Sequence, residues 1–206
     1  GIKSWSLAAY ETCPGAIDPS TGNLVPACDS CYASLGFYSY PAPKAIRAFN
    51  KEDWKRAEWT DEMVALLETE RYFRWFDSGD MYSMELAEKM LDLMTRTPNT
   101  KHWLPTRQYK FPKFAAILSK MDALPNVKVR RSSDSVLGAF TAGLHGSTII
   151  EKGSAVPIGV TACNAPKNAG KCNGCRACWD KAVDVIAYEG HGNKFKRVIK
   201  IAKAAK

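Results

Sequence analysis

Seven cysteines in two groups are the feature that most limits what this 206-residue chain can fold into. They are Cys13, Cys28 and Cys31 in the first group, and Cys163, Cys172, Cys175 and Cys178 in the second. A stretch of 131 residues without cysteine separates the two groups. An odd number of cysteines leaves one thiol without a partner in a disulfide framework, so disulfides are disfavoured. The grouping predicts two metal sites in a reducing compartment.

The second group repeats a cysteine at every third residue, in Cys172-Asn-Gly-Cys175-Arg-Ala-Cys178, and Cys163 stands nine residues upstream. A 4Fe-4S iron-sulfur cluster is bound by such closely spaced cysteines. Structural zinc more often takes its thiolates as two separated pairs, so zinc is the alternative. Scattered core cysteines are disfavoured because the intervening residues are polar. This pattern predicts an iron-sulfur cluster at the four cysteines.

The first group offers only three thiols, which leaves one iron of a cubane open to a small molecule. Two other interpretations stay open, namely a zinc site completed by a histidine or carboxylate, and cysteines without metal. The histidines available as a fourth ligand are His102, His145 and His191. His191 follows the last expected strand, near the second group in sequence, and is either a cluster ligand or an ordinary loop histidine.

Composition favours one domain over residues 1–206, with a three-cysteine loop at 13–31 and a four-cysteine segment at 163–178. No apolar stretch reaches the length of a membrane span, and the first residues lack the apolar core of a signal peptide. We therefore expect no membrane partner and a cytoplasmic location. The net charge of +8 is concentrated near the C-terminus, in a basic helix expected at 194–206. This helix is either a nucleic-acid surface or a solvated face.

Strand-like and helix-like segments alternate along most of the chain, which predicts an α/β fold with a largely parallel sheet. The expected strands are 2–8, 72–77, 102–106, 127–132, 156–161 and 183–188. The expected helices between them are 42–56, 60–70 with Thr60 as N-cap, 83–95 and 111–124. The apolar residues of the last two helices are expected in the core, namely Leu86, Met90, Leu93, Met94, Phe114, Ile117, Leu118 and Met121.

Polar turns follow three of these strands, where an α/β sheet usually carries its chemistry. Ser78, Gly79 and Asp80 form a turn that binds an amine or ribose, or in which Asp80 caps the next helix. Arg107 follows the next strand, and Arg130, Arg131, Ser133 and Asp134 end the one after it. These segments are candidates for an anionic or nucleotide-like ligand, or are simple turns and strand-edge charges. Phosphate-loop and dinucleotide-binding fingerprints are absent from the sequence.

Taken in order, several motifs resemble the bacteriophage gene-product-88 family. They are Cys13-Pro-Gly, Cys28-x-x-Cys31-Tyr-Ala, Phe73-Arg-Trp, Ser78-Gly-Asp, Thr106-Arg, Ser133-Asp, Val156-Pro and Cys172-x-x-Cys175-x-x-Cys178-Trp. Three cysteines after a first strand also look like a compact radical S-adenosylmethionine fold. That resemblance implies an incomplete (β/α) barrel-like sheet and S-adenosylmethionine at the open iron. The implied cofactor-binding residues are Ser78, Gly79, Asp80, Ser133 and Asp134.

The favoured hypothesis is a phage-type iron-sulfur protein, in the host cytoplasm, that receives electrons from a donor and reductively cleaves S-adenosylmethionine. The second cluster would relay electrons or hold substrate, and Asp77 and Arg107 would join the pocket. One alternative is a ferredoxin-like electron-transfer protein without S-adenosylmethionine chemistry. The other is a zinc-stabilised nucleic-acid-binding module that uses the basic C-terminal helix and exposed aromatic residues.

Overall fold

The computed structural model describes residues 1–204, and the chain divides into two compact units. Residues 1–15 and 33–129 form the first unit, and residues 16–32 together with the chain from 130 onward form the second. Each unit therefore combines a short N-terminal segment with a longer later one. The two are described separately below.

The first unit is built on the sheet β1 (Lys3–Trp5), β2 (Tyr72–Trp75), β3 (Lys101–Thr106) and β4 (Val127–Arg131), ordered β1-β2-β3-β4. β1 pairs with β2 and β2 with β3, both in parallel, as the sequence predicts. The last two residues of β4 are assigned to the second unit.

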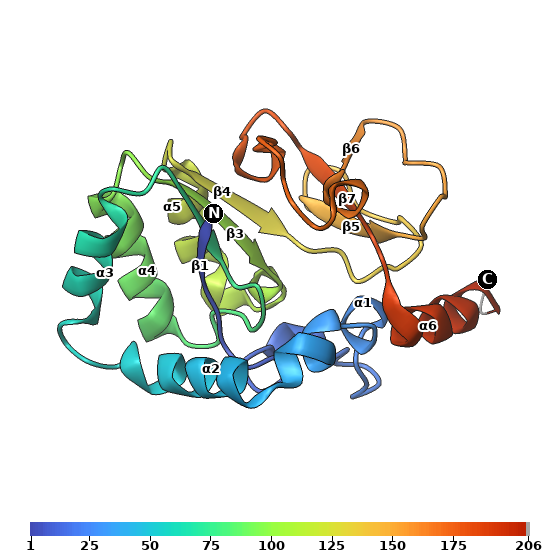
Figure 1. The fold of residues 1–206 in the computed structure, drawn as a ribbon, viewed down its shortest axis with the longest axis horizontal. Helices are drawn as coiled ribbons and strands as arrows, with labels where there is room; N and C mark the ends of the chain where they lie inside the picture. Colours follow the sequence, from blue (N-terminus) through green and yellow to red (C-terminus); the bar gives the residue numbers. More distant parts are fainter. Residues whose placement is uncertain (205–206) are drawn as a thin grey trace. The chain divides into compact units, whose positions relative to one another are not determined.

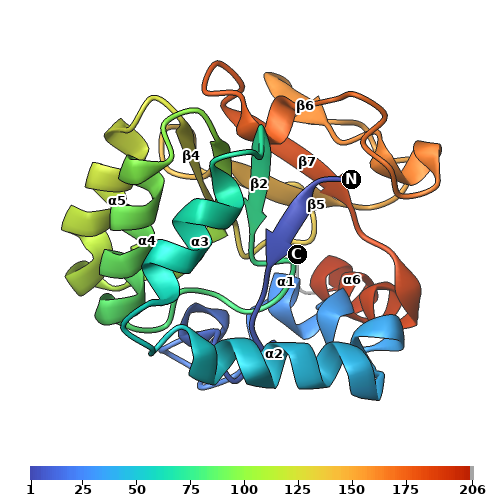
Figure 2. The same ribbon diagram turned by 60° about the vertical axis from the view of Figure 1, so that its left-hand side comes forward.

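Four helices belong to the first unit, namely α2 (Pro41–Asp53), α3 (Trp59–Leu67), α4 (Met84–Arg96) and α5 (Ala115–Ala123). Short 3-10 turns accompany them, at η2 (Tyr32–Ser34), η3 (Gly36–Ser39), η4 (Gln108–Lys110) and η5 (Pro112–Phe114). Helices α3, α4 and α5 pack in a row along one side of the strands (Figure 2). Every apolar residue that the sequence places in the core of the last two helices is buried there.

The structure decides the predicted N-caps of two helices, α4 and α3. Ser83 caps α4, because its hydroxyl accepts the backbone N–H of Leu86 at 3.1 Å. Asp80 therefore does not cap this helix. The prediction that Thr60 caps α3 is wrong, because the helix begins at Trp59 and Thr60 is buried inside its first turn.

The second unit has a smaller sheet, β5 (Ser147–Ile150), β6 (Val160–Ala162) and β7 (Val185–Glu189), with β7 in the centre of the order β5-β7-β6. Both pairings are parallel. Helices α1 (Pro26–Asp29) and α6 (Gly192–Ala204) lie side by side and share a small apolar cluster (Figure 1). The 3-10 turns η6 (Ala165–Asn168) and η7 (Ala177–Trp179) also belong to this unit, while η1 (Pro14–Ala16) begins in the first unit and ends in the second.

The α/β class and the parallel pairing are confirmed, and the described strands form two sheets without a closed barrel. The expected strands differ from the structure in two places. β5 has no counterpart among them, and in place of the strand expected at 156–161 the structure has β6 at Val160–Ala162. Val156 and Ile158 are exposed, so that apolar run lies on the surface instead of in a sheet. No helix in residues 1–204 is long and apolar enough to cross a membrane.

Candidate metal centre

The four cysteines of the second group line one hollow in the second unit. Its wall is formed by Cys163, Cys172, Cys175 and Cys178, with Ala162, Asn164, Ala165, Ala177, Trp179 and Ile186 between them. Three elements contribute to it, since β6 leads into the first cysteine, η7 carries the last and β7 supplies the apolar base. The fold thus gathers thiols that lie up to fifteen residues apart in the sequence.

A tight turn joins Cys172 to Cys175. The N–H of Cys175 donates to the carbonyl of Cys172 at 2.9 Å. The two central residues, Asn173 and Gly174, have φ values of 43° and 83°. Positive φ at both central positions is typical of a type I′ turn, and Asn-Gly is the pair that adopts it at least cost. The Asn-Gly sequence between these cysteines therefore favours the turn that brings both thiols to one hollow.

The first and last cysteines are tied to the sheet. The N–H of Cys163 donates to the carbonyl of Ala187 on β7 at 2.8 Å, which fixes the chain where β6 ends. The sulfur of Cys178 lies 3.3 Å from the hydroxyl of Tyr188, also on β7. A phenol at this distance can donate to a thiolate, in the way that partners outside the ligand shell orient metal ligands.

Arg130 is buried beneath the same loop, with no exposed surface. Its guanidinium donates to the backbone carbonyls of six residues, Gly146, Ala177, Cys178, Asp180, Val183 and Asp184, at 2.7 to 3.2 Å. Burial lowers the pKa of Arg130, while the nearby anionic forms of Tyr188 and Cys178, and then two aspartates, raise it. The sequence left Arg130 as an anion-binding or strand-edge residue, whereas the structure makes it the anchor of the cysteine loop.

The four thiols are suitable metal ligands, but their positions in this structure are not those of a metal-bound site. Four thiols are the ligands of iron-sulfur clusters and of structural zinc. Within residues 1–204, however, no three histidine, cysteine or acidic side chains are arranged to hold a metal ion. The hollow measures about 30 Å³, which is the space of one small ion rather than of a cubane. Binding a cluster would require the thiols to move outward.

The three cysteines of the first group are divided between the two units, with Cys13 in the first and Cys28 and Cys31 in the second. The backbone turns tightly at each of them. The N–H of Cys13 donates to Tyr10, that of Cys28 to Val25 and that of Cys31 to Cys28. All seven cysteines of the chain are present as thiols. A shared site at these three remains a prediction from the sequence.

The histidines are placed differently from their expected roles. His102 is fully buried in the first unit, and both ring nitrogens are used there, by Trp75 and by Thr97. It is therefore not available as a metal ligand. The ring of His191 lies 6.2 Å from that of Tyr32, the residue after Cys31.

The Ser78-Gly79-Asp80 turn is held by the first unit itself. The hydroxyl of Ser78 donates to the carbonyl of Leu7 at 2.6 Å. Gly79 has a φ of 80°, and a Cβ there would lie 2.5 Å from that of Leu7, so only glycine fits. These contacts tie the end of β2 to the segment after β1.

Asp80 is the other fixed point of that turn. Its carboxylate accepts the hydroxyl of Thr106 and the backbone N–H groups of Arg107 and Met81, each at 2.8 Å. Burial raises the pKa of Asp80 to about 6 against the opposing effect of these three donors. The turn therefore joins β1, β2 and β3, and its binding of an amine remains a prediction.

Ser133 and Asp134 lie in the second unit, after β4. The Ser133 hydroxyl donates to the carbonyl of Ala139 at 2.6 Å. The carbonyl of Asp134 accepts the N–H of Ala27 at 3.0 Å, next to Cys28 on α1. This segment thus positions the helix that carries Cys28, while the other predicted cofactor-binding residues belong to the first unit.

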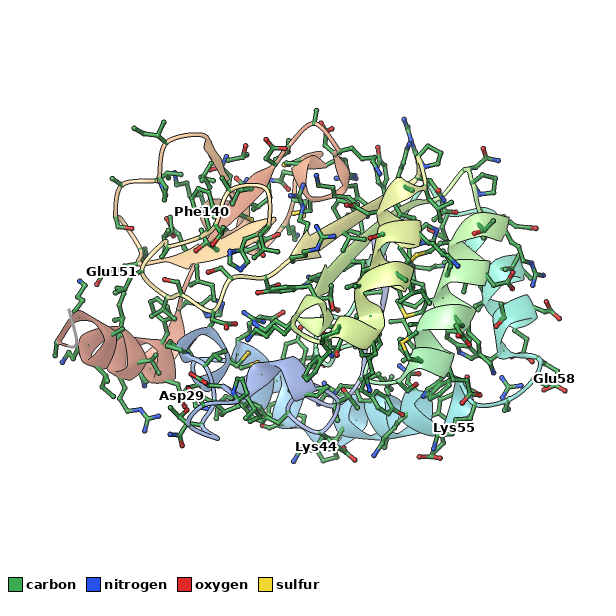
Figure 3. The ribbon with its side chains drawn as sticks, turned by 180° about the vertical axis from the view of Figure 1, so that it is seen from behind. Asp29, Lys44, Lys55, Glu58, Phe140 and Glu151 are labelled. Carbon is green, nitrogen blue, oxygen red and sulfur yellow. The ribbon has the colours of Figure 1, made fainter. Side chains whose placement is uncertain are left out.

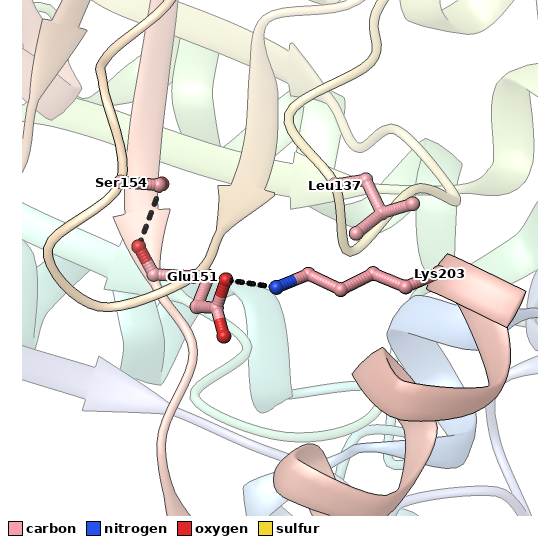
Figure 4. A pocket seen from close by; sticks show the side chains of 4 residues that line it. All are labelled: Leu137, Glu151, Ser154 and Lys203. Atoms are coloured by element: carbon pink, nitrogen blue, oxygen red, sulfur yellow. Dashed lines mark hydrogen bonds and ion pairs between the residues drawn. The ribbon is translucent and has the colours of Figure 1, made fainter.

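A larger hollow of about 260 Å³ opens on the second unit, lined by Leu137, Glu151, Ser154 and Lys203 (Figure 4). Lys203 pairs with the carboxylate of Glu151 at 2.6 Å, and the Ser154 hydroxyl donates to the Glu151 carbonyl at 2.7 Å. A second ion pair on α6 joins Arg197 to Asp29 at 3.2 Å, and Asp29 is labelled in Figure 3. The basic helix therefore uses two of its cations to attach itself to neighbouring segments.

Comparison with known proteins agrees with the motif order. Residues 2–181 match the family described as gene product 88. Neither the curated proteins nor the solved structures contain a match to the chain. The family match spans both cysteine groups and most of both units. The chain belongs to the gene product 88 family.

Proposed function

We propose that this protein is an iron-sulfur protein whose C-terminal cluster is held by Cys163, Cys172, Cys175 and Cys178. The observation that carries the proposal is that these four cysteines, and no other titratable residues, line a single hollow. The Asn173-Gly174 turn and the Arg130 anchor support it, because both fix the backbone that bears the thiols. Four thiolates close a cluster completely, so this centre would exchange electrons rather than bind substrate.

The second part of the proposal concerns Cys13, Cys28 and Cys31. Three thiolates at an open cluster would bind S-adenosylmethionine, and its reductive cleavage is the proposed reaction. The support is the number of cysteines and the resemblance of the surrounding motifs. The ferredoxin-like alternative keeps both centres as electron carriers without S-adenosylmethionine, and the closed four-thiol set favours it for the C-terminal centre.

Zinc is the second candidate for the C-terminal centre, and the size of the hollow favours it. A space of about 30 Å³ is closer to the size of one ion than to that of a cubane, so zinc would need a smaller rearrangement of the thiols than a cluster would. In that case the centre would stabilise the second unit. The exposed Lys196 and Lys200 of α6 would then be candidates for a nucleic-acid surface.

The test is anaerobic purification followed by analysis of iron, sulfide and zinc, and electron paramagnetic resonance after dithionite reduction. Iron with sulfide and a reducible signal would support the cluster, whereas stoichiometric zinc without colour would support the second candidate. A signal from the N-terminal site that shifts on adding S-adenosylmethionine, with release of methionine, would support the proposed reaction. An unshifted signal would favour the electron carrier.

Matched variants assign each signal to its cysteines. Cys175→Ala should remove the C-terminal metal and leave any response to S-adenosylmethionine, while Cys31→Ala should do the reverse. Lys171→Ala, an exposed change in the same loop, should alter neither. If Cys175→Ala retained all the metal of the unaltered protein, the C-terminal assignment would be wrong.

A further inference from the structure

The positive charge of Arg130 is buried and has anionic groups near it, but no carboxylate forms an ion pair with it among the described residues. It has no exposed surface, and its hydrogen-bond acceptors are all backbone carbonyls. Within the described part of the chain, residues 1–204, Arg130 makes no ion pair. Asp180 and Asp184 supply carbonyls, but both residues are exposed and their carboxylates are screened by solvent.

A buried cation without an anion is costly, because the carbonyl dipoles replace only part of its hydration. Such a charge is tolerated where an anion is buried nearby. The carbonyls bound by Arg130 include those of Ala177 and Cys178, which belong to the wall of the cysteine hollow. Four thiolates around a dication, or around a cluster core of the same charge, leave a net charge of roughly −2.

We propose that Arg130 is the buried counter-charge of the four-cysteine centre and that it stabilises the metal-bound state beyond its role as an anchor of the loop. The inference rests on the proposed C-terminal metal centre. It predicts that removal of this charge weakens metal binding more than it weakens the metal-free fold. A residue that served only to hold six carbonyls would lose the same affinity on replacement by lysine, which keeps the charge, as on replacement by glutamine.

The test compares zinc affinities of full-length variants by competition with a chromophoric chelator. All carry Cys13→Ala, Cys28→Ala and Cys31→Ala, so that only the second group binds metal. Arg130→Gln should lower the affinity by roughly 10- to 100-fold, the usual effect of losing a partner of the ligand shell. Arg131→Gln removes the same charge one residue further along and should change it by less than about threefold.

Arg130→Lys separates charge from anchoring. Lysine keeps the charge but cannot bond six carbonyls. The zinc affinity of Arg130→Lys should therefore be closer than the affinity of Arg130→Gln to that of the protein with Arg130. This variant also decides the matter if Arg130→Gln does not fold. An affinity loss in Arg130→Lys of 10-fold or more would show that anchoring alone is needed and would overturn the proposal.

Unfolding with and without zinc gives an independent readout. The unfolding free energy lost in Arg130→Gln should be greater with saturating zinc than without it, and the difference should equal the free energy that corresponds to the ratio of the two zinc affinities. Equal losses in the two states would overturn the proposal while leaving the metal centre intact. If the protein with Arg130 bound neither zinc nor iron at the second group, the metal centre itself would be wrong and the inference would fall with it.

Discussion

At the scale of single residues, His102 shows how burial fixes a protonation state in the first unit. Its Nδ1 accepts the indole N–H of Trp75 at 3.3 Å, so that nitrogen bears no proton. Nε2 then carries the proton and donates to the hydroxyl of Thr97 at 2.9 Å, which in turn donates to Leu93. Burial lowers the pKa of His102 to about 4, against the raising effect of Thr97.

This arrangement predicts a pH dependence of stability with a definite sign. The unfolded histidine titrates near 6.5, and the stability that neutral His102 contributes is present above that pH and is lost as the pH falls through about 4. A difference of this size corresponds to about 3 kcal/mol of unfolding free energy. Chemical denaturation of the protein and of His102→Gln between pH 4 and 7 should show curves that converge toward the lower pH.

Asp80 acts in the opposite direction over the same range, so the comparison with His102→Gln is needed. Its pKa is raised, and its contribution to stability is present below about 4 and is lost as the pH rises through about 6. Nitrogen chemical shifts of His102 provide the direct check. Titration of the ring near pH 6.5 would contradict the buried, neutral assignment.

The role of a single residue was predictable from the sequence only where residue spacing indicated it. The cysteines of the second group follow a ligand spacing, and the structure gathers all four. Arg130 stands in a strand that reads Val-Lys-Val-Arg-Arg, where nothing in the local sequence indicates a buried guanidinium. Its six acceptors come from segments up to 54 residues away, so only the tertiary fold reveals its role.

At the scale of elements, the turn between Cys172 and Cys175 depends on Gly174. Its φ of 83° is strained for any residue with a Cβ, although no atom stands within 4 Å of that position. Gly174→Ala should therefore cost about 1 to 2 kcal/mol through backbone strain and lower the metal affinity, because the turn that orients two thiols relaxes. Thermal unfolding and metal titration would measure the two effects.

Gly153 provides a matched control in the same unit. It has a φ of 78°, is equally free of neighbours within 4 Å, and lies away from the cysteines. Gly153→Ala should lower stability by a similar amount and leave metal affinity unchanged. Equal losses of affinity in both variants would mean that the turn at 172–175 has no special role in binding.

The elements themselves were predictable where the pattern was long. α4 extends over thirteen residues with an apolar stripe and a serine cap, and it was located within one residue at each end. β5 has only four residues, Ser-Thr-Ile-Ile, and gives no alternation to read. The run around Val156 and Ile158 is apolar enough to be read as a strand, yet both residues are exposed. Apolar residues also occur singly at protein surfaces, so apolar composition without periodicity does not indicate a buried strand.

At the scale of the whole molecule, the two units differ in how much apolar core each contains. Among the described residues, the main cluster of the first unit joins 23 buried apolar residues, whereas the cluster at α1 and α6 of the second joins five, with a few more buried in its sheet and η7. Small cores are commonly supplemented by metal. Because the metal-binding free energy of a structural site is also folding free energy, the second unit should depend on its centre more than the first does.

Hydrogen exchange with and without bound metal tests this dependence. Removal of the metal by chelation should lower the protection of the β7 amides by roughly 100-fold, because β7 lines the cysteine hollow. The amides of α4, in the first unit, should keep their protection. Cys175→Ala should reproduce the effect of chelation without a chelator, and Lys171→Ala should not. Unchanged protection in β7 would show that the centre contributes nothing to the fold of the second unit. Equal loss in α4 and β7 would show that the two units unfold as one, and that the large core of the first does not hold it together alone.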